Sequence, residues 1–261
     1  MSSTHNQSFS PADYLVVSDI HAMSPDVDVS RFITFVNLNP AKHLVLAGDT
    51  LDFYMWRHGG DKRVNLNAGQ QLLDFLHQLA NDGVTITLIP GNHDLDWAWL
   101  NQSAKVPKRY RTAGYPTDMR PQLEALLELP NVHVTNKVEI DNTLVIHGHE
   151  GWQGDWLWRI SELGDRATNY KLVGRQFRRK VMSGQKIRFM AVEGHGFYRR
   201  LASWATKLGK THVIHGHTHC EGTRTRGSVT LSCLPAWRMS EGPGGGMSYT
   251  AGEWKRLNPP T

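Results

Sequence analysis

The stretch THVIHGHTHC, residues 211–220, places four histidines within eight positions: His212, His215, His217 and His219. The short apolar run that precedes them is typical of a buried strand that ends where the imidazoles begin. A single buried histidine is most often a hydrogen-bonded core residue. Four histidines at the end of one strand instead indicate that this edge of the sheet carries a functional site.

Five other β-branched runs also end in glycine or polar residues: YLVVSD (14–19), HLVLAGD (43–49), VTITLIPGNHD (84–94), NTLVIHGH (142–149) and SVTLSCLPAW (228–237). Helical patterns lie between them, at residues 28–38, at 68–83 before Gly83, and at 117–129 with Thr117 as the expected N-cap. This alternation predicts an α/β architecture with largely parallel pairing in the first half. We expect the later strands, from Val132 on, to be antiparallel.

Length and composition favour one globular domain over residues 1–261, because 39% of the residues are hydrophobic and can form a full core. The polar N-terminus shows no export signal, and no apolar run approaches the roughly 18 residues of a membrane span. The chain has two cysteines, Cys220 and Cys233, which we expect to remain thiols. These features favour a cytoplasmic protein, with peripheral contact with a membrane as an alternative.

The positive charge is concentrated in one segment. Residues 155–210 contain thirteen Lys and Arg against four acids, a net charge of +9 in a chain whose total is +5. Apolar residues at helical spacing over 156–182 and 197–209 predict amphipathic helices there. We therefore expect residues 153–210 to form a basic helical insertion, a lid over a site, although a solvated basic surface would give the same pattern.

Metal-capable residues gather in five blocks at the predicted strand ends. The blocks are Asp19 and His21; Asp49 and Asp52; Asn92, His93 and Asp94; His147 and His149; and His215, His217 and His219. The carboxyl ends of neighbouring strands in an open α/β sheet meet at one crevice. Residues two apart on an extended chain point the same way, so Asp19 and His21 can share one ion. We expect the blocks to converge in space.

The donor set favours a dinuclear centre of transition metals. Several imidazoles with carboxylate and amide oxygens suit Mn, Fe, Co or Zn better than Mg or Ca. A structural zinc finger is disfavoured because the set contains no cysteine. About seven donors exceed what one ion takes, so two ions that share a bridging carboxylate are expected. Manganese is the first choice, with iron, zinc, cobalt and nickel as alternatives.

The blocks D-x-H, G-D-x-x-D, G-N-H-D, H-G-H and G-H-T-H, in this order, resemble the signature of the calcineurin-like metallophosphoesterase superfamily. The resemblance implies a four-layered αββα sandwich with a dinuclear site at the strand ends. It implies one ion on Asp19, His21 and His219, the other on Asn92, His147 and His217, with Asp49 bridging both. It further implies that His93 is the catalytic imidazole and that Asp52 orients it.

Four neighbouring residues have less certain roles. His149 competes with His147 for the place of the ligand, and His147 is preferred because it ends the apolar run. His215 is expected to belong to the strand or to support the ligands, and Asp94 to make an outer hydrogen bond. Cys220 is not expected to bind metal.

The predicted chemistry is hydrolysis of a phosphoric ester or anhydride. A metal-bridging hydroxide attacks phosphorus in line, and a cationic His93 stabilises the developing charge or protonates the leaving oxygen. Our preferred substrate is a pyrophosphate such as a nucleoside-diphosphate sugar or a lipid conjugate. Arg175, Arg178 and Arg179 in the basic insertion are the expected phosphate clamps.

The insertion and the run GDTLDFYMW (48–56) are similar to the UDP-2,3-diacylglucosamine diphosphatase branch of the superfamily. That branch usually carries H-G-D in the fourth block, where this chain has H-G-H. Apolar residues of the segment either line a groove for acyl chains or pack the helices onto the sandwich: Trp156, Leu157, Trp158, Phe189, Met190, Phe197 and Trp204.

Three alternatives remain. A phosphomonoesterase or phosphoprotein phosphatase would use the same centre, and a nuclease-type phosphodiesterase would use the basic segment to bind nucleic acid. A non-catalytic scaffold is disfavoured because all seven expected ligands and His93 are present.

Overall fold

The computed structural model describes residues 11–53, 64–94, 119–149, 196–239 and 243–259. The expected helix at 156–182, most of the basic insertion and the arginines at 175, 178 and 179 lie outside these ranges, as does Thr117.

The first sheet has six strands in the order β11-β10-β1-β2-β3-β4. Its members are β1 (Ala12–Val17), β2 (Ala41–Ala47), β3 (Thr85–Ile89), β4 (Val132–Val134), β10 (Gly246–Thr250) and β11 (Glu253–Leu257). Strands β1 to β4 pair in parallel, while β10 runs antiparallel to both β1 and β11. The predicted parallel pairing of the first half is confirmed.

The second sheet has five strands in the order β5-β6-β7-β9-β8. Its members are β5 (Val138–Ile140), β6 (Thr143–Val145), β7 (His212–His215), β8 (Gly222–Arg226) and β9 (Val229–Cys233). The expectation of antiparallel later strands is correct for the pairs β5–β6, β8–β9 and, in the first sheet, β10–β11. It is wrong for β3–β4, β6–β7 and β7–β9, which are parallel.

The physical reason for these parallel pairs lies in the connections. A helix lies between β3 and β4 and another between β6 and β7, and such a crossover returns the chain in the same direction. After β7 the chain first forms the edge strand β8, and β9 then lies between β7 and β8. Helices were predicted in both connections, at 117–129 and 197–209, so the sequence already contained the feature that favours parallel pairing here.

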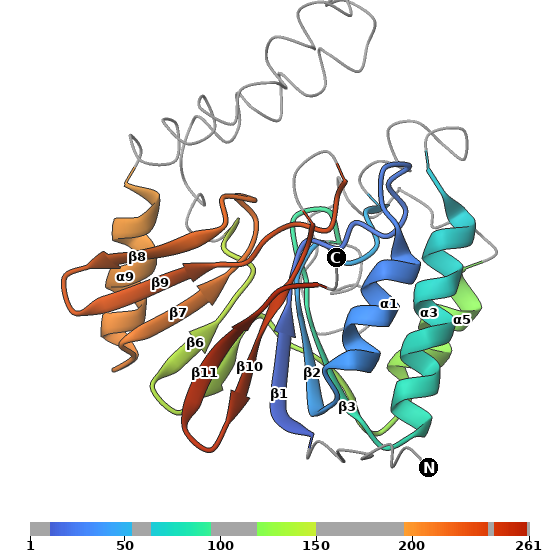
Figure 1. The fold of residues 1–261 in the computed structure, drawn as a ribbon, viewed down its shortest axis with the longest axis horizontal. Helices are drawn as coiled ribbons and strands as arrows, with labels where there is room; N and C mark the ends of the chain where they lie inside the picture. Colours follow the sequence, from blue (N-terminus) through green and yellow to red (C-terminus); the bar gives the residue numbers. More distant parts are fainter. Residues whose placement is uncertain (1–10, 54–63, 95–118, 150–195, 240–242, 260–261) are drawn as a thin grey trace, which may run out of the picture.

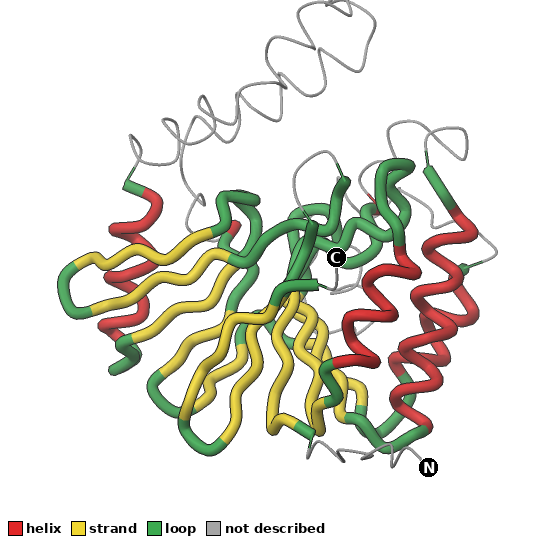
Figure 2. The backbone as a smooth tube through the Cα atoms, viewed as in Figure 1, coloured by secondary structure: helices red, strands yellow, loops and turns green. Residues whose placement is uncertain are grey.

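Helices cover the outer faces of both sheets (Figures 1 and 2). Helices α1 (Val29–Leu38), α3 (Leu66–Asn81) and α5 (Arg120–Leu127) lie on the first sheet, and α9 (Phe197–Lys207) lies on the second. The two sheets face each other between these helical layers. The predicted four-layered αββα sandwich is confirmed.

Alternation along each strand builds three separate cores. In β2, Leu44 and Leu46 pack towards the helices, whereas Val45 and Ala47 pack towards the second sheet. From the second sheet, Ile214 enters the same inter-sheet core. Because successive side chains of a strand point to opposite faces, each central strand contributes to two cores.

The helices begin and end largely where the sequence predicts. The Asp28 side chain accepts from the Arg31 amide at the start of α1, and Gly83 adopts a positive φ of 88° just after α3. The last described helix, α9, is also followed by a glycine with positive φ, Gly209. Helix α3 begins at Leu66, two residues before its predicted start. Among the helices of the described ranges, none is long and apolar enough to cross a membrane.

Candidate metal centre

The predicted metal-ligating and catalytic residues lie beyond strand ends at one edge of the sandwich. These strands end at the upper edge in Figure 1. Asp19 and His21 follow β1, Asp49 and Asp52 follow β2, and Asn92 and His93 follow β3. His147 follows β6, and His217 and His219 follow β7. The first sheet therefore supplies three of the loops and the second sheet supplies two.

The loops reach this arrangement through left-handed turns. Positive φ values of 51° to 72° occur at Asp19, His21, Asp49, Asp52, His217 and His219. Asp19 and His21 were expected to point the same way because they alternate on an extended strand. That reason is wrong, since β1 ends at Val17. Residues other than glycine adopt this conformation only where the surroundings impose it.

Backbone hydrogen bonds supply that constraint. The amide of Asp19 donates to Gly48 O at 3.0 Å, and the amide of His21 donates to Asp49 O at 2.8 Å. The loops after β1 and β2 are thus joined directly beyond the ends of their strands. Their carboxylates and imidazole are held in place by the main chain.

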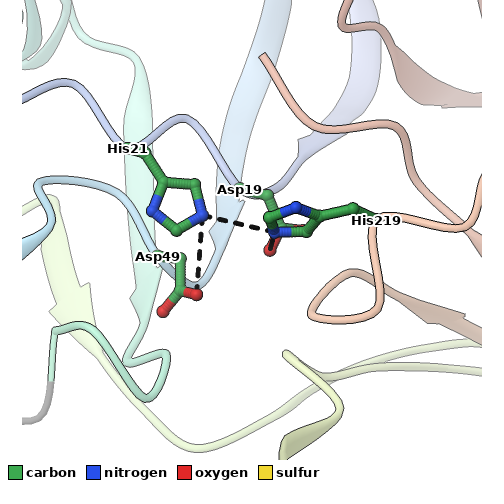
Figure 3. Close-up of side chains that lie close together, drawn as sticks. All are labelled: Asp19, His21, Asp49 and His219. Carbon is green, nitrogen blue, oxygen red and sulfur yellow. Dashed lines mark hydrogen bonds and ion pairs between the residues drawn. The ribbon is translucent and has the colours of Figure 1, made fainter. Parts of the chain in front are cut away.

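The first group of possible ligands contains Asp19, His21, Asp49 and His219, whose donor atoms lie within 4.8 Å of one another (Figure 3). His219 Nε2 lies 3.1 Å from Asp19 Oδ1, and His21 Nε2 lies 3.7 Å from Asp49 Oδ2. The Nε2 atoms of His21 and His219 are 3.3 Å apart. Both aspartates are buried.

The second group contains Asp49, His147 and His217, with Asn92 beside them. His147 Nε2 lies 3.4 Å from Asp49 Oδ2 and 3.2 Å from Asn92 Oδ1. Asp49 belongs to both groups, so the structure brings together all seven predicted ligands around one shared carboxylate.

Asp52 contacts two imidazoles. Its Oδ1 lies 2.6 Å from His93 Nδ1, as the predicted orienting role requires, and its Oδ2 lies 3.1 Å from His21 Nδ1. The second contact was not foreseen, because nothing in the spacing of these residues indicates it. Asp52 therefore connects the first group to His93, whose side chain remains 23% exposed.

The hydrogen bonds of the imidazoles fit bound cations. His147 Nδ1 donates to Ala47 O at 2.9 Å, and His21 Nδ1 donates to Asp52. These bonds place the proton on Nδ1, so each Nε2 carries a lone pair that faces other acceptors. Acceptor atoms that face one another at such distances repel unless a cation lies between them. The His and Asp clusters thus suit a dinuclear divalent metal site.

The charges of the site shift the pKa values of its groups. Burial alone would lower the pKa of His93, but the negative charges of Asp52 and Asp49 outweigh it and raise this pKa to about 9. Burial opposes ionisation of Asp19, yet the nearby His219 lowers its pKa to about 2. The pKa of Asp52 is lowered in the same way by His93 and His21. The site therefore holds anionic carboxylates beside a cationic His93.

Asp94 makes the expected outer hydrogen bonds. Its carboxylate accepts from the amides of Thr50 at 2.6 Å and Leu51 at 3.1 Å. It thereby holds the loop that carries Asp49 and Asp52. Burial and the charge of Asp49 raise the pKa of Asp94 to about 6.

Two glycines lie beside the ligand groups. Gly148 turns the chain there, with a φ of 113°. Gly91 instead permits a close approach, because a Cβ at this position would collide with Asp49. The main chain after β3 can therefore reach the shared carboxylate, and the His93 amide donates to Asp49 Oδ1 at 2.8 Å.

The remaining candidates lie around these groups. The ring centroid of His149 is 5.5 Å from that of His147, and His149 belongs to neither group of donor atoms. His215 is buried, and its Nδ1 contacts Gly216 O at 2.9 Å. Cys220 and Cys233 are free thiols.

Two of the apolar residues considered for an acyl groove are described. Phe197 is fully buried in the core between α9 and the second sheet, and Trp204 packs against the same core. Both residues thus help to pack the helix onto the sandwich. The other five lie outside the described residues.

The sequence of this chain is similar to that of a known protein family. The sequence model of the calcineurin-like phosphoesterases matches residues 13–221, most of the chain. The chain belongs to this family. The resemblance of the five blocks is thus confirmed, and the protein is a metal-dependent phosphohydrolase. No curated protein matches the sequence significantly.

Solved structures to which the chain is similar include several phosphoesterases. An archaeal phosphodiesterase is 14% identical, with 94% of this chain and 98% of that chain covered and a TM-score of 0.43. A cold-active protein-tyrosine phosphatase of a psychrophilic Shewanella species is 15% identical, with 95% and 81% covered and a TM-score of 0.45. The phosphoesterase YfcE of E. coli is 14% identical, with 90% and 86% covered and a TM-score of 0.39.

The Asp52 contact predicts a measurable change in His93. In the metal-free protein the imidazole should titrate near its raised pKa of about 9, and Asp52→Asn should lower this pKa towards 6.5 because a negative charge is lost. NMR titration of the His93 ring measures both values. Asp28→Asn, at an exposed helix cap, is the control and should leave the pKa unchanged. An unchanged midpoint in Asp52→Asn would show that Asp52 does not hold the charge of His93.

Proposed function

We propose that this chain hydrolyses a phosphoric ester or anhydride with two divalent ions. Asp19, His21 and His219 hold one ion, and Asn92, His147 and His217 hold the other. The observation that carries the proposal is the place of Asp49, whose buried carboxylate lies within reach of both groups. One carboxylate shared by two sets of imidazoles is the arrangement that a dinuclear centre requires.

When bound, the two ions would lower the pKa of water to give a nucleophile and would hold the oxygens of the phosphoryl group. The residues of the chain fix where this chemistry takes place. Asp52 and Ala47 O set the tautomers of His21 and His147, so that Nε2 of each faces inward. Because the outer partners are buried, the donors are positioned before an ion or substrate arrives.

His93 is the proposed proton donor to the leaving oxygen. Asp52 holds its Nδ1 at 2.6 Å, and the ion pair with this buried carboxylate favours the cationic ring. The partial exposure of this side chain, 23%, gives the ring access to a substrate while Asp52 stays buried. A positioned general acid of this kind contributes typically 10²- to 10⁴-fold in rate.

The proposed metal is manganese, with iron, zinc, cobalt and nickel as alternatives. The support is the ligand chemistry, since imidazole nitrogen with carboxylate and amide oxygen suits these ions. A cytoplasmic location, with or without contact with a membrane surface, is also a proposal and rests on the sequence alone.

The proposed substrate is a pyrophosphate, such as a nucleoside-diphosphate sugar or a lipid conjugate. Its support is the basic segment at 153–210, of which α9 is the described part. Phe197 at the start of α9 lies with its ring centroid 6.5 Å from that of His217. Arg199 and Arg200 follow directly. The start of α9 thus lies beside the second group of ligands, where cations of the segment can meet a second phosphate.

A screen of phosphoesters tests the substrate class. Manganese-loaded protein should hydrolyse nucleoside-diphosphate conjugates faster than p-nitrophenyl phosphate or bis-p-nitrophenyl phosphate, and a chelator should abolish each activity. A preference for the monoester would indicate a phosphatase, and a preference for the diester or for nucleic acid would indicate a nuclease-type enzyme. Absence of all turnover in the metal-loaded protein would leave only the scaffold alternative.

His93→Ala tests the catalytic assignment. The variant should retain two ions per chain, because His93 is not one of the seven ligands, while kcat should fall by about 10²- to 10⁴-fold. Metal analysis and steady-state kinetics measure the two effects separately. His77→Ala, on α3 and away from the site, is the matched control. Unchanged turnover in His93→Ala would remove this residue from the mechanism.

The predicted clamps Arg175, Arg178 and Arg179 are tested together. Replacing all three by alanine should raise KM for pyrophosphate substrates at least about tenfold, because each charge-assisted contact to a phosphate contributes binding energy. Hydrolysis of p-nitrophenyl phosphate should change little, since that substrate has no second phosphate. Lys42→Ala serves as the charge control, because this exposed residue lies at the start of β2, whereas the site lies beyond the end of that strand. Equal losses on both substrates would contradict the clamp assignment.

A further inference from the structure

The loop that carries His217 and His219 passes over the end of a neighbouring strand. It leaves β7 after His215 and enters β8 at Gly222, and both of these residues pair with Cys233 in the sheet. Cys233 is the last residue of β9, which lies between β7 and β8. Residues 216–221 therefore cross directly over Cys233.

The thiol of Cys233 contacts this loop at three places. Its Sγ lies 3.2 Å from Thr218 Oγ1 and donates to Gly216 O at 3.7 Å. The backbone N–H of Cys220 also donates to it. These contacts flank His217 and His219 on each side. Asp19 holds the same loop from another direction, because both of its oxygens accept from the His217 amide at 3.0 Å.

The surroundings of Cys233 keep the sulfur protonated. The residue is 2% exposed, and burial raises the pKa of its thiol to about 12. A protonated thiol can donate to one carbonyl while it accepts from a hydroxyl and an amide. The sulfur of Cys233 thus contacts all three groups of the loop: the Thr218 hydroxyl, the Gly216 carbonyl and the Cys220 amide.

The loop needs such support because of its backbone. His217 and His219 have φ values of 65° and 52°, a conformation that side chains disfavour unless neighbouring contacts impose it. Both residues belong to the groups of possible metal ligands, one to each group. A shift of this loop would therefore displace a ligand of each proposed ion at once.

We infer that Cys233 is a positioning residue of the metal centre, whose thiol fixes the turn that presents His217 and His219. The inference rests on the proposed dinuclear function. It assigns a role to a buried thiol that contacts none of the reacting atoms. Outer contacts of this kind typically contribute about 10- to 100-fold in metal affinity.

The test compares Cys233→Val, Cys233→Ala and Cys233→Ser with the wild type. Valine fills the space without a polar atom, alanine removes both volume and hydrogen bonds, and serine restores a donor and acceptor on a shorter side chain. The Kd for Mn²⁺, measured by calorimetry, should rise about 10- to 100-fold in the valine and alanine variants and less in the serine variant. The visible spectrum of the Co²⁺-loaded protein, which reports ligand geometry, should change in the same order.

Cys220→Ser is the matched control. It alters the other thiol of the chain, within the same loop, and keeps the backbone N–H that contacts Cys233. Its Kd and Co²⁺ spectrum should match the wild type. Thr218→Val provides a second variant that removes one contact while Cys233 stays in place, and it should also weaken Mn²⁺ binding. If circular dichroism shows that Cys233→Val is unfolded, the result for Thr218→Val decides the question.

The outcomes separate the two proposals. Wild-type affinity and an unchanged Co²⁺ spectrum in a folded Cys233→Val, or in Thr218→Val where the former is unfolded, overturn the inference and leave the dinuclear centre standing. A wild-type protein that binds no ions overturns the dinuclear centre and the inference with it. Loss of affinity in valine and alanine with partial rescue by serine supports both.

Discussion

The structure depends on three carboxylates, Asp19, Asp49 and Asp52, that lie buried between the ends of two sheets. Anionic groups removed from water are costly unless cations and hydrogen-bond donors surround them. Imidazoles surround each of them, and main-chain amides donate to Asp19 and Asp49. Yet His21 donates its Nδ1 proton to Asp52, and His147 donates its Nδ1 proton to Ala47 O. The Nε2 atoms of both rings therefore offer lone pairs, not protons, to the centre. The net demand for positive charge is therefore met best by metal ions, and the family to which the chain belongs accords with this demand.

The same contacts join the two halves of the sandwich. His147, beyond a strand of the second sheet, donates to Ala47 O at the end of β2, and the His217 amide donates to Asp19 beyond β1. The Trp237 amide, past the end of β9, donates to Asp19 O at 3.0 Å. Functional side chains and the connections between sheets thus occupy the same edge. A rigid site follows, because neither sheet can shift without breaking hydrogen bonds that orient its ligands.

The sequence predicts the site better than it predicts the path of the chain. Each block of metal-capable residues is contiguous, so its position after an apolar run indicates the strand end on which it lies. Pairing direction depends instead on how the connections place the strands in the sheet, and the parallel β6–β7 pair was missed although a helix was predicted between these strands. The left-handed turns at Asp19 and His219 follow from contacts between distant loops, and a periodic pattern cannot reveal them. The contact of Asp52 with His21 and that of Cys233 with Thr218 are likewise tertiary, and only the folded arrangement shows them.

The arrangement also explains why the site indicates a reaction more sharply than a substrate. The supports of the ligands, such as Asp94 beneath the loop after β2 and Cys233 beneath the loop after β7, lie on the buried side of the centre. His93 is more exposed than its partner Asp52, so this imidazole lies on the side of the centre that is open to solvent. Groups on the buried side act on any phosphoryl group alike. Discrimination between substrates must therefore come from segments that border the open side, and α9 with its arginines is the described part of the chain that begins beside His217. The core of the fold fixes the chemistry, and in the proposed function the choice of substrate is assigned to the segment between β6 and β7.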